Sequence, residues 1–179
     1  MCIRDSVSGF GSTRRIVLYD TVLEQLPDDQ IESIVAHELG HVSGNDVLTG
    51  TLLGALGAAA GVAALGWLLS WTPLLQRSGA DAAGDPRIVP LVLFLLAVGT
   101  LVSTPLQNLV SRHIEARADV HALDLTDDPD AFVAMQRDLA GTNLSDPDPP
   151  AAWQWLFGSH PTTAERVGIA QDWERLDRP

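Results

Sequence analysis

The sequence has no lysine, so all eleven of its positive charges are arginine side chains. A Schiff-base lysine and the lysine of a phosphate-binding loop are therefore excluded. The formal net charge is −12, and an acidic chain with scattered arginines lacks the clustered positive charge that phosphate contacts need. We therefore expect no nucleic-acid partner.

Cysteine is almost as scarce, since Cys2 is the only one in 179 residues. The chain cannot form an internal disulfide framework, and it cannot build a zinc site from several thiolates. The first ten residues, MCIRDSVSGF, also lack the apolar core of a secretory signal peptide. Residues 1–6 are not typical of the rest of the chain, and we expect them to be non-native and the chain to be truncated at its N-terminus.

Charge is missing altogether from two long stretches, residues 47–76 and 88–111. A helix of about 20 apolar residues can cross a bilayer, so we predict transmembrane helices at 47–75 and 88–110. The polar link RSGADAAGDPR would turn them into an antiparallel hairpin whose outer ends lie on the same side of the membrane. The alternative is a pair of buried helices in a soluble all-α domain, but so short a chain could hardly cover them.

The remaining sequence predicts a mainly α fold with a small β element. RRIVLYD (residues 14–20) is typical of a strand, and VSGFG before it is a partner strand or a loop. LPDDQIESIVAHELGH begins a helix, with Pro27 at its entry and Asp29 and Glu32 spaced as a capping box. After the second apolar run the helix continues, and a further helix is predicted at residues 127–140. An extended loop then covers residues 143–150, and a last helix follows Pro161. We expect one domain, residues 1–179.

The stretch HELGHVSGND carries the strongest chemical signal. His37 and His41 are four residues apart, so on a helix their imidazoles share one face and can bind one ion. Glu38 would lie beside the ion, placed to take a proton from water. This is the usual skeleton of a zinc protease site.

A third protein ligand is not found nearby. The metzincin pattern continues with a glycine and a third histidine; Gly44 occupies the glycine position, but Val47 occupies the last one and Asp46 falls one residue early. The local third ligand is therefore missing, and the ligand must come from elsewhere in the chain.

The predicted hairpin indicates where the third ligand lies. His41 lies just before the first apolar run and Glu115 just after the second, so an antiparallel hairpin brings them to the same depth. Glu115 is thus the candidate third ligand of a two-histidine, one-glutamate site with an open fourth position. Asp119, one helical turn on, could hold a ligand imidazole by its second nitrogen. His113 and His121 are rivals, but they lie on other helix faces and are better explained as surface or packing residues.

Three segments, HELGH, SRHIEARAD and SHPTTAER, occur in the order found in a known family. With GFGSTRRIVLYDTVLEQL before them, the chain from about Val7 to its end resembles the membrane-bound zinc metallopeptidases of the CAAX prenyl protease and HtpX heat-shock protease type. The resemblance implies a zincin-like catalytic core with the two-helix transmembrane hairpin inserted between the zinc-ligand helices. It implies one zinc ion per chain, bound by His37, His41 and Glu115, with Glu38 as catalytic base.

The resemblance also implies roles for three further residues. Asp119 would support the site from outside the ligand set, His160 would face the substrate and stabilise the tetrahedral intermediate, and Arg166 would lie near His160. From the residues alone, His160 could instead cap the last helix, and Arg166 could be a solvated charge. The strand at RRIVLYD, or the one before it, would pair with the substrate backbone.

The function that follows is a zinc metalloendopeptidase, a hydrolase integral to a bacterial inner membrane, with its active site in the cytoplasm on resemblance alone. Its substrates would be peptides or membrane proteins. An arginine-only, alanine-rich and aspartate-rich composition indicates a GC-rich bacterium, which favours membrane-protein quality control over prenyl-peptide cleavage. A membrane-anchored zinc-binding scaffold without activity is the alternative of another class; Val47 and the apolar runs argue against a soluble metzincin-like protease.

Overall fold

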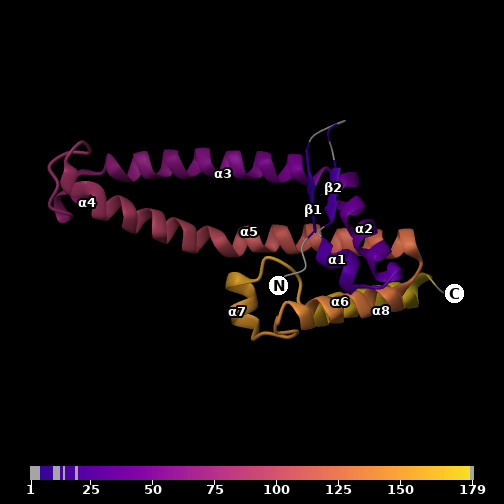
Figure 1. The fold of residues 1–179 in the computed structure, drawn as a ribbon. Coiled ribbons are helices and arrows are strands. Elements are labelled where there is room, and N and C mark those ends of the chain that lie inside the picture. The colour runs from indigo at the N-terminus through magenta and orange to yellow at the C-terminus, as the bar shows by residue number, and fades with distance from the viewer. Residues whose placement is uncertain (1–4, 10–12, 14, 19, 178–179) are drawn as a thin grey trace. The chain divides into compact units, whose positions relative to one another are not determined.

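The computed structural model describes residues 5–9, 13, 15–18 and 20–177 of the chain (Figure 1). These residues form two compact units, one made of residues 1–49 and 107–179 and the other of residues 50–106. Helices make up most of both units, and the described strands form one two-stranded sheet in the first unit. The predicted mainly α fold with a small β element is confirmed.

The first unit begins with β1 (Asp5–Ser8) and β2 (Arg15–Leu18), which pair antiparallel with Ser6 opposite Val17. The strand predicted at residues 14–20 is therefore present, and VSGFG contributes its first residues to a partner strand. Residues 1–4, 10–12, 14 and 19 lie outside the described part of the chain. A short helix, α1 (Asp20–Gln25), follows β2 directly.

The helix that carries the HELGH motif is α2 (Asp28–Ser43), and it begins without a capping box. Pro27 takes the N-cap position with extended backbone, φ −63° and ψ 157°, and no side chain caps the helix. Because the cap lies at Pro27, the third helical residue is Gln30 rather than Glu32. The predicted pairing of Asp29 with Glu32 is therefore wrong, and Asp29 accepts a hydrogen bond from the N–H of Gln30 instead.

Three helices complete the first unit after the second half of α5 (Val89–Thr126). They are α6 (Pro129–Thr142), α7 (Ala151–Phe157) and α8 (Thr163–Asp177). Asp128 caps α6 by accepting from the N–H of Ala131 at 2.9 Å. The predicted helix after residue 127, the loop at 143–150 and the last helix are confirmed, whereas α7 was not predicted.

The core of the first unit lies where α6 packs against both α2 and α8 (Figure 1). Phe132 and Met135 on α6 meet Val22, Ile34 and Leu123 in one buried cluster. On α6 the apolar positions recur every three or four residues, which puts them on one helix face. This core fixes the positions of α2, α5 and α8 relative to one another.

The helices α2 and α5 approach each other closely at Gly40. A Cβ atom added to Gly40 would lie 2.9 Å from the Cα of Ala118, which is closer than real Cβ atoms come. Glycine and alanine at this crossing therefore allow the backbones to pack together. The histidine face of α2 is thereby held against the part of α5 that carries Glu115 and Asp119.

The second unit contains the rest of α3 (Asp46–Leu69), α4 (Thr72–Arg77), the 3-10 helix η2 (Pro86–Ile88) and the start of α5. The first predicted span was 47–75, but α3 ends at Leu69 and the separate helix α4 begins after Trp71, whose backbone is extended. Pro73 has no N–H with which to continue the helix to the carbonyl of Leu69. The second predicted span, 88–110, lies in α5 except for Ile88, and α5 continues unbroken through Pro105 to Thr126.

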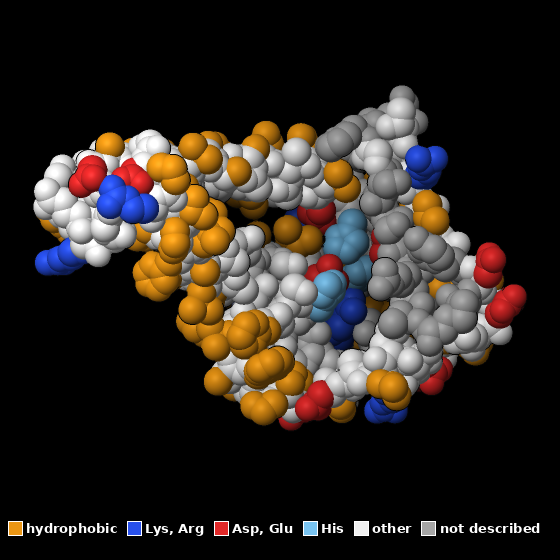
Figure 2. All heavy atoms as spheres, turned by 60° about the vertical axis from the view of Figure 1, so that its left-hand side comes forward, with side chains coloured by type: hydrophobic (Ala, Val, Ile, Leu, Met, Phe, Trp, Pro, Cys, Tyr) orange, Lys and Arg blue, Asp and Glu red, His pale blue; other side chains and the backbone are white. Residues whose placement is uncertain are grey.

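Both long helices of the second unit are apolar enough and long enough to cross a membrane. No residue of α3 is buried, and Figure 2 shows hydrophobic side chains along this unit, with charged ones at its tip. The alternative of two buried core helices is therefore wrong for the described residues. Helices whose exposed side chains are this apolar are suited to lipid.

The core position of Phe132 gives a stability prediction. Phe132 is fully buried, so Phe132→Ala should lower the free energy of unfolding by about 3–5 kcal/mol, because it removes buried apolar area and leaves a cavity. Thermal unfolding in detergent, followed by circular dichroism, should show a clearly lower melting temperature. The matched control is Leu125→Ala, at a position 56% exposed, which should melt close to the parent. Equal melting temperatures for all three proteins would contradict this core assignment.

Candidate active site

A cavity of about 450 Å³ lies beside α2 in the first unit. The histidines and the charged side chains around them are visible in the hollow at the centre of Figure 2. Residues from α2, the start of α3, α5, α6 and α8 line it, together with the loop before α8. They include His37, Glu38, His41, Asp46, Glu115, Gln136, His160 and Arg166.

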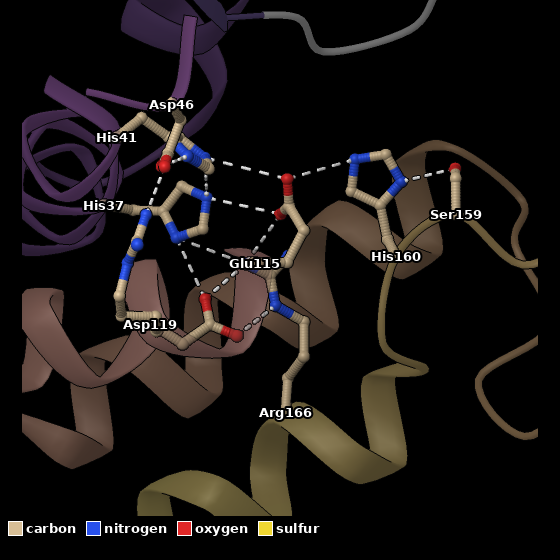
Figure 3. A network of polar contacts seen from close by, with 9 residues as sticks. His37, His41, Asp46, Glu115, Asp119, Ser159, His160 and Arg166 are labelled. Carbon is tan, nitrogen blue, oxygen red and sulfur yellow. Dashed lines mark hydrogen bonds and ion pairs between the residues drawn. The ribbon is translucent and has the colours of Figure 1, made fainter. Parts of the chain in front are cut away.

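Three of these side chains converge on one point of the cavity (Figure 3). The Nε2 atoms of His37 and His41 lie 3.1 Å apart. Glu115 places Oε2 3.5 Å from Nε2 of His37 and Oε1 3.6 Å from Nε2 of His41. Two helices thus supply these groups, α2 through its i, i+4 histidines and α5 through Glu115.

The other ring nitrogens of the two histidines face away from that point. Nδ1 of His37 lies 2.9 Å from Oδ1 of Asp119, and Nδ1 of His41 lies 2.9 Å from Oδ2 of Asp46. A carboxylate accepts a hydrogen bond at each of these positions, which favours the tautomer with the proton on Nδ1. Both Nε2 lone pairs then point toward Glu115.

This arrangement fits a metal ion. With the protons on Nδ1, two Nε2 lone pairs and a carboxylate face one another at these distances, and one cation between them can bind all three. Tetrahedral ligands at about 2.0–2.2 Å from zinc are separated by about 3.3–3.6 Å, which is close to the observed separations. A ligand atom of Glu38 also lies within 4.8 Å of those of His37 and His41.

The electrostatics of the site favour positive charge between the carboxylates, and a proton on His37 can supply it. Burial lowers the pKa of His37, but hydrogen bonds to Asp119 and Glu115 outweigh burial and raise it to about 9. Burial raises the pKa of Glu115, yet the hydrogen bond with His37 and the nearby His160 and Arg166 lower it to about 2. The pKa of Asp119 is lowered as well, because His37 and Arg166 more than offset its burial.

Arg166 and His160 approach the site from the C-terminal part of the chain. Arg166 on α8 binds both oxygens of Asp119, with Nε at 2.8 Å from Oδ2, and its Nη2 lies 3.8 Å from Glu115. His160 is 62% exposed, places Nε2 3.6 Å from Oε1 of Glu115, and has Nδ1 2.9 Å from the hydroxyl of Ser159. Both therefore line the cavity, with Arg166 on the carboxylate behind His37 and His160 at the rim.

A second carboxylate and arginine, which the sequence analysis did not assign, mirror Asp119 and Arg166. Asp46 binds His41 through one oxygen and Arg117 through the other. The turn between α2 and α3 allows this, because Asn45 adopts a φ of 53° and lets Asp46 fold back over His41. One feature of the sequence could have indicated this role. Asp46 is the last charged residue before the uncharged run 47–76, and it lies one residue before Val47, where a metzincin has its third histidine.

Gln136 was also missed. Its side chain is only 4% exposed, it lines the cavity, and no hydrogen bond joins it to another described residue. It lines a second cavity of about 360 Å³ that shares His160 and Arg166 with the first. A buried carboxamide beside a cavity can bind the backbone of a peptide, whereas the rival histidines His113 and His121 do not line either cavity.

Comparisons with known proteins agree with one another. The model of peptidase family M48 matches residues 7–174. "Uncharacterized metalloprotease YhfN" of Bacillus subtilis (strain 168) is 38% identical over 167 residues, which are 92% of this chain and 39% of that protein. "CAAX prenyl protease 1 homolog" of Oryza sativa subsp. japonica is 32% identical over 174 residues, 92% of this chain and 39% of that protein.

A "Protease HtpX homolog" of Ligilactobacillus salivarius (strain UCC118) is 25% identical over 162 residues, 82% of this chain and 55% of that protein. The crystal structure of S. mikatae Ste24p has the same fold, with a TM-score of 0.79 at 24% identity over 94% of this chain and 43% of that one. The chain thus spans about two fifths to a little over half of the length of these proteins.

The contact between Asp46 and His41 gives a prediction about metal affinity. Asp46→Ala removes the acceptor that fixes the His41 ring, and loss of such a partner weakens metal binding by about 10–100-fold. Zinc titration against a competing chromophoric chelator measures it. Asp130→Ala, at an exposed position on α6, is the matched control and should bind zinc like the parent. Unchanged affinity in Asp46→Ala would show that His41 needs no such support.

Proposed function

Because the chain belongs to peptidase family M48, we propose that it is the catalytic part of a membrane-embedded zinc metalloendopeptidase. In this proposal residues 1–179 form one metallopeptidase domain, with the hairpin of apolar helices inserted between α2 and the polar half of α5. One zinc ion per chain would be held by His37, His41 and Glu115. The relatives named metalloprotease support a metal-dependent hydrolase.

The observation that carries the proposal is the convergence of three acceptors. His37, His41 and Glu115 meet at 3.1–3.6 Å with both Nδ1 atoms engaged elsewhere. Three protein ligands leave the fourth tetrahedral position for water or substrate, which is the arrangement of catalytic rather than structural zinc sites. Zinc held there would supply a Lewis acid that polarises the scissile carbonyl and lowers the pKa of water.

Glu38 is the proposed base. It is only 6% exposed, it lines the cavity, and its carboxylate lies within 4.8 Å of the histidine ligand atoms. In peptide hydrolysis Glu38 would accept a proton from the attacking water and deliver it to the amine nitrogen that leaves when the C–N bond breaks. Glu38 thus ends the cycle ionised, as it began.

His160 and Arg166 have different proposed roles. The His160 ring stands at the rim, where Nε2 could donate to the oxygen that gains negative charge as the carbonyl is attacked. Arg166 is occupied by Asp119, so its role is to position His37 through that carboxylate. Asp119 and Asp46 would keep the two imidazoles in the protonation state that presents Nε2.

The proposed substrates are peptide segments of membrane proteins. The apolar helix α3 begins at Asp46, which itself contacts His41, so the cavity lies beside the point where the chain would enter the bilayer. We propose a bacterial inner membrane with the cavity on the cytoplasmic side, and quality control as the role. This choice rests on the arginine-only composition and on the relatives named HtpX.

Prenyl-peptide cleavage is the second candidate, because relatives named CAAX prenyl protease 1 homolog are 32% identical to the chain. Paired assays with a prenylated peptide and its unprenylated form separate the two roles. Cleavage of both at similar rates supports the quality-control role, and strict dependence on the prenyl group overturns it. A zinc-binding scaffold without activity would cleave neither.

The role of Glu38 gives the central functional prediction. Glu38→Gln removes the base but keeps the shape of the side chain, so peptidase activity of the detergent-purified protein should fall by about 10²–10⁴-fold. Its zinc content should stay at one ion per chain, because Glu38 is not a ligand. Activity is measured on an unstructured peptide, and zinc by inductively coupled plasma mass spectrometry.

Glu115→Ala is the contrasting variant. It removes a ligand, so both zinc and activity should be lost, whereas Glu38→Gln should lose activity alone. Glu174 on α8 is half-buried and does not line the cavity, so Glu174→Gln serves as the unaffected control. Full activity in Glu38→Gln would overturn the assignment of the base, and full zinc content in Glu115→Ala would overturn the ligand set.

A further inference from the structure

The helix α7 presents three aromatic side chains to the outside of the first unit. Trp153, Trp155 and Phe157 are 61%, 58% and 51% exposed, and the rings of Trp153 and Phe157 stack at 4.6 Å. Figure 2 shows hydrophobic side chains gathered on the part of this unit below the histidines. Single exposed apolar residues are ordinary, but three large aromatic residues within seven positions form a patch that calls for a partner.

From this patch we propose that α7 is a membrane-interface contact, with its aromatic side chains inserted between lipid headgroups and acyl chains. The proposal rests on the proposed function, since it requires that the apolar helices cross a bilayer. It adds a second, peripheral contact with the lipid, made by the part of the chain that carries the catalytic cavity.

Hydrogen bonds to α5 fix the position of α7 along the α5 axis, and so its level relative to the end of the apolar span. The side chain of Asn108 donates to the carbonyl of Leu156 at 2.7 Å, and Arg112 donates to the carbonyls of Gly158 at 2.6 Å and Gln154 at 3.2 Å. Asn108 lies within the uncharged run of α5, and Arg112 is the first charge after it. The end of α7 is therefore level with the last turn of the span, within about 6 Å along the helix axis.

The same hydrogen bonds suit an environment with little water. The last carbonyls of a helix have no partner within the helix and normally bind water or a capping group. Here side chains of α5 donate to two carbonyls in the last turn of α7 and to that of the following Gly158. Asn108 itself is only 8% exposed. The backbone end of α7 can thus approach lipid without leaving polar groups unpaired.

The composition of α7 favours the bilayer interface over other occupants. Tryptophan is enriched at membrane–water interfaces because its ring is apolar and its N–H is polar. The helix, AAWQWLF, has no charged residue, and Leu109 on the adjoining part of α5 is 59% exposed. The patch therefore lies beside the last part of the uncharged run of α5, within the same unit.

The contact would fix the height of the catalytic cavity above the bilayer. α7 leads directly to Ser159 and His160, and the side chain of Gln154 donates to the carbonyl of His160 at 2.7 Å. A helix held in the interface therefore holds the loop that carries His160. Substrate segments that emerge from the membrane would reach the cavity next to this loop.

Tryptophan fluorescence of the full chain in phosphatidylcholine vesicles tests the proposal. In one variant Trp67, Trp71 and Trp173 are replaced by Phe, so that only the α7 tryptophans emit. Lipids brominated in the upper part of the acyl chain should quench this emission by more than half, and aqueous iodide should quench it little. The quenching should not change with salt, because no charge takes part.

The matched control keeps only Trp173, which is hydrogen-bonded to Asp124. Asp124 lies about 24 Å along α5 from Asn108, so brominated lipid should not quench Trp173. A second control keeps only Trp67, in the last turn of α3, and Trp71, just before α4. Circular dichroism of each variant confirms that it is folded.

Strong iodide quenching of the α7 tryptophans without lipid quenching would overturn the proposal, because the patch would then face water. Protection from both quenchers would overturn it as well, because protein would then cover the patch. If Trp67 and Trp71 are quenched by lipid and the α7 tryptophans are not, only the α7 contact fails. If none is quenched by lipid, the membrane part of the proposed function fails.

Discussion

Three hydrogen-bond acceptors, Nε2 of His37, Nε2 of His41 and the carboxylate of Glu115, are held against one another where α2 packs on α5. Such a group needs a cation or a proton between its members, and the surrounding structure holds it together. The close crossing of Gly40 and Ala118 brings the two helices into contact, and the core around Phe132 fixes them from the other side. The first unit is thus built around a place for positive charge.

Each histidine is supported by its own carboxylate and arginine. Asp119 and Arg166 lie behind His37, and Asp46 and Arg117 lie behind His41. The arginines balance the carboxylates, so the acceptors keep their orientation without adding net charge behind the rings. Asp46 is also the first residue of α3, which ties the start of an apolar helix to the geometry of a proposed ligand.

Much of this could be predicted from the sequence, because the signals were local or periodic. The HELGH spacing, the two uncharged runs and the return of the chain after the hairpin were enough to bring Glu115 and Asp119 to the histidines, which is where the structure places them. Their roles as ligand and support stay predictions. The capping box failed because Pro27, rather than a polar side chain, begins α2.

The features that were missed depend on contacts between distant parts of the chain. Asp46 reaches His41 only because Asn45 turns the backbone, and Arg117 completes the pair from α5. α7 was missed because seven residues between prolines and a glycine are typical of a loop, and the bonds from Asn108 and Arg112 hold its C-terminal end against α5. No local pattern in the sequence could indicate such long-range bonds.

The central claim is that the chain holds zinc with two imidazoles and one carboxylate and leaves one position open. Zinc K-edge X-ray absorption of the detergent-purified full chain tests it most directly. The account predicts a four-coordinate shell of nitrogen and oxygen at about 2.0–2.2 Å, two imidazoles by their outer scattering, and one oxygen that inhibitor binding replaces. A shell closed by a third imidazole such as His160, or one that no inhibitor changes, would contradict it.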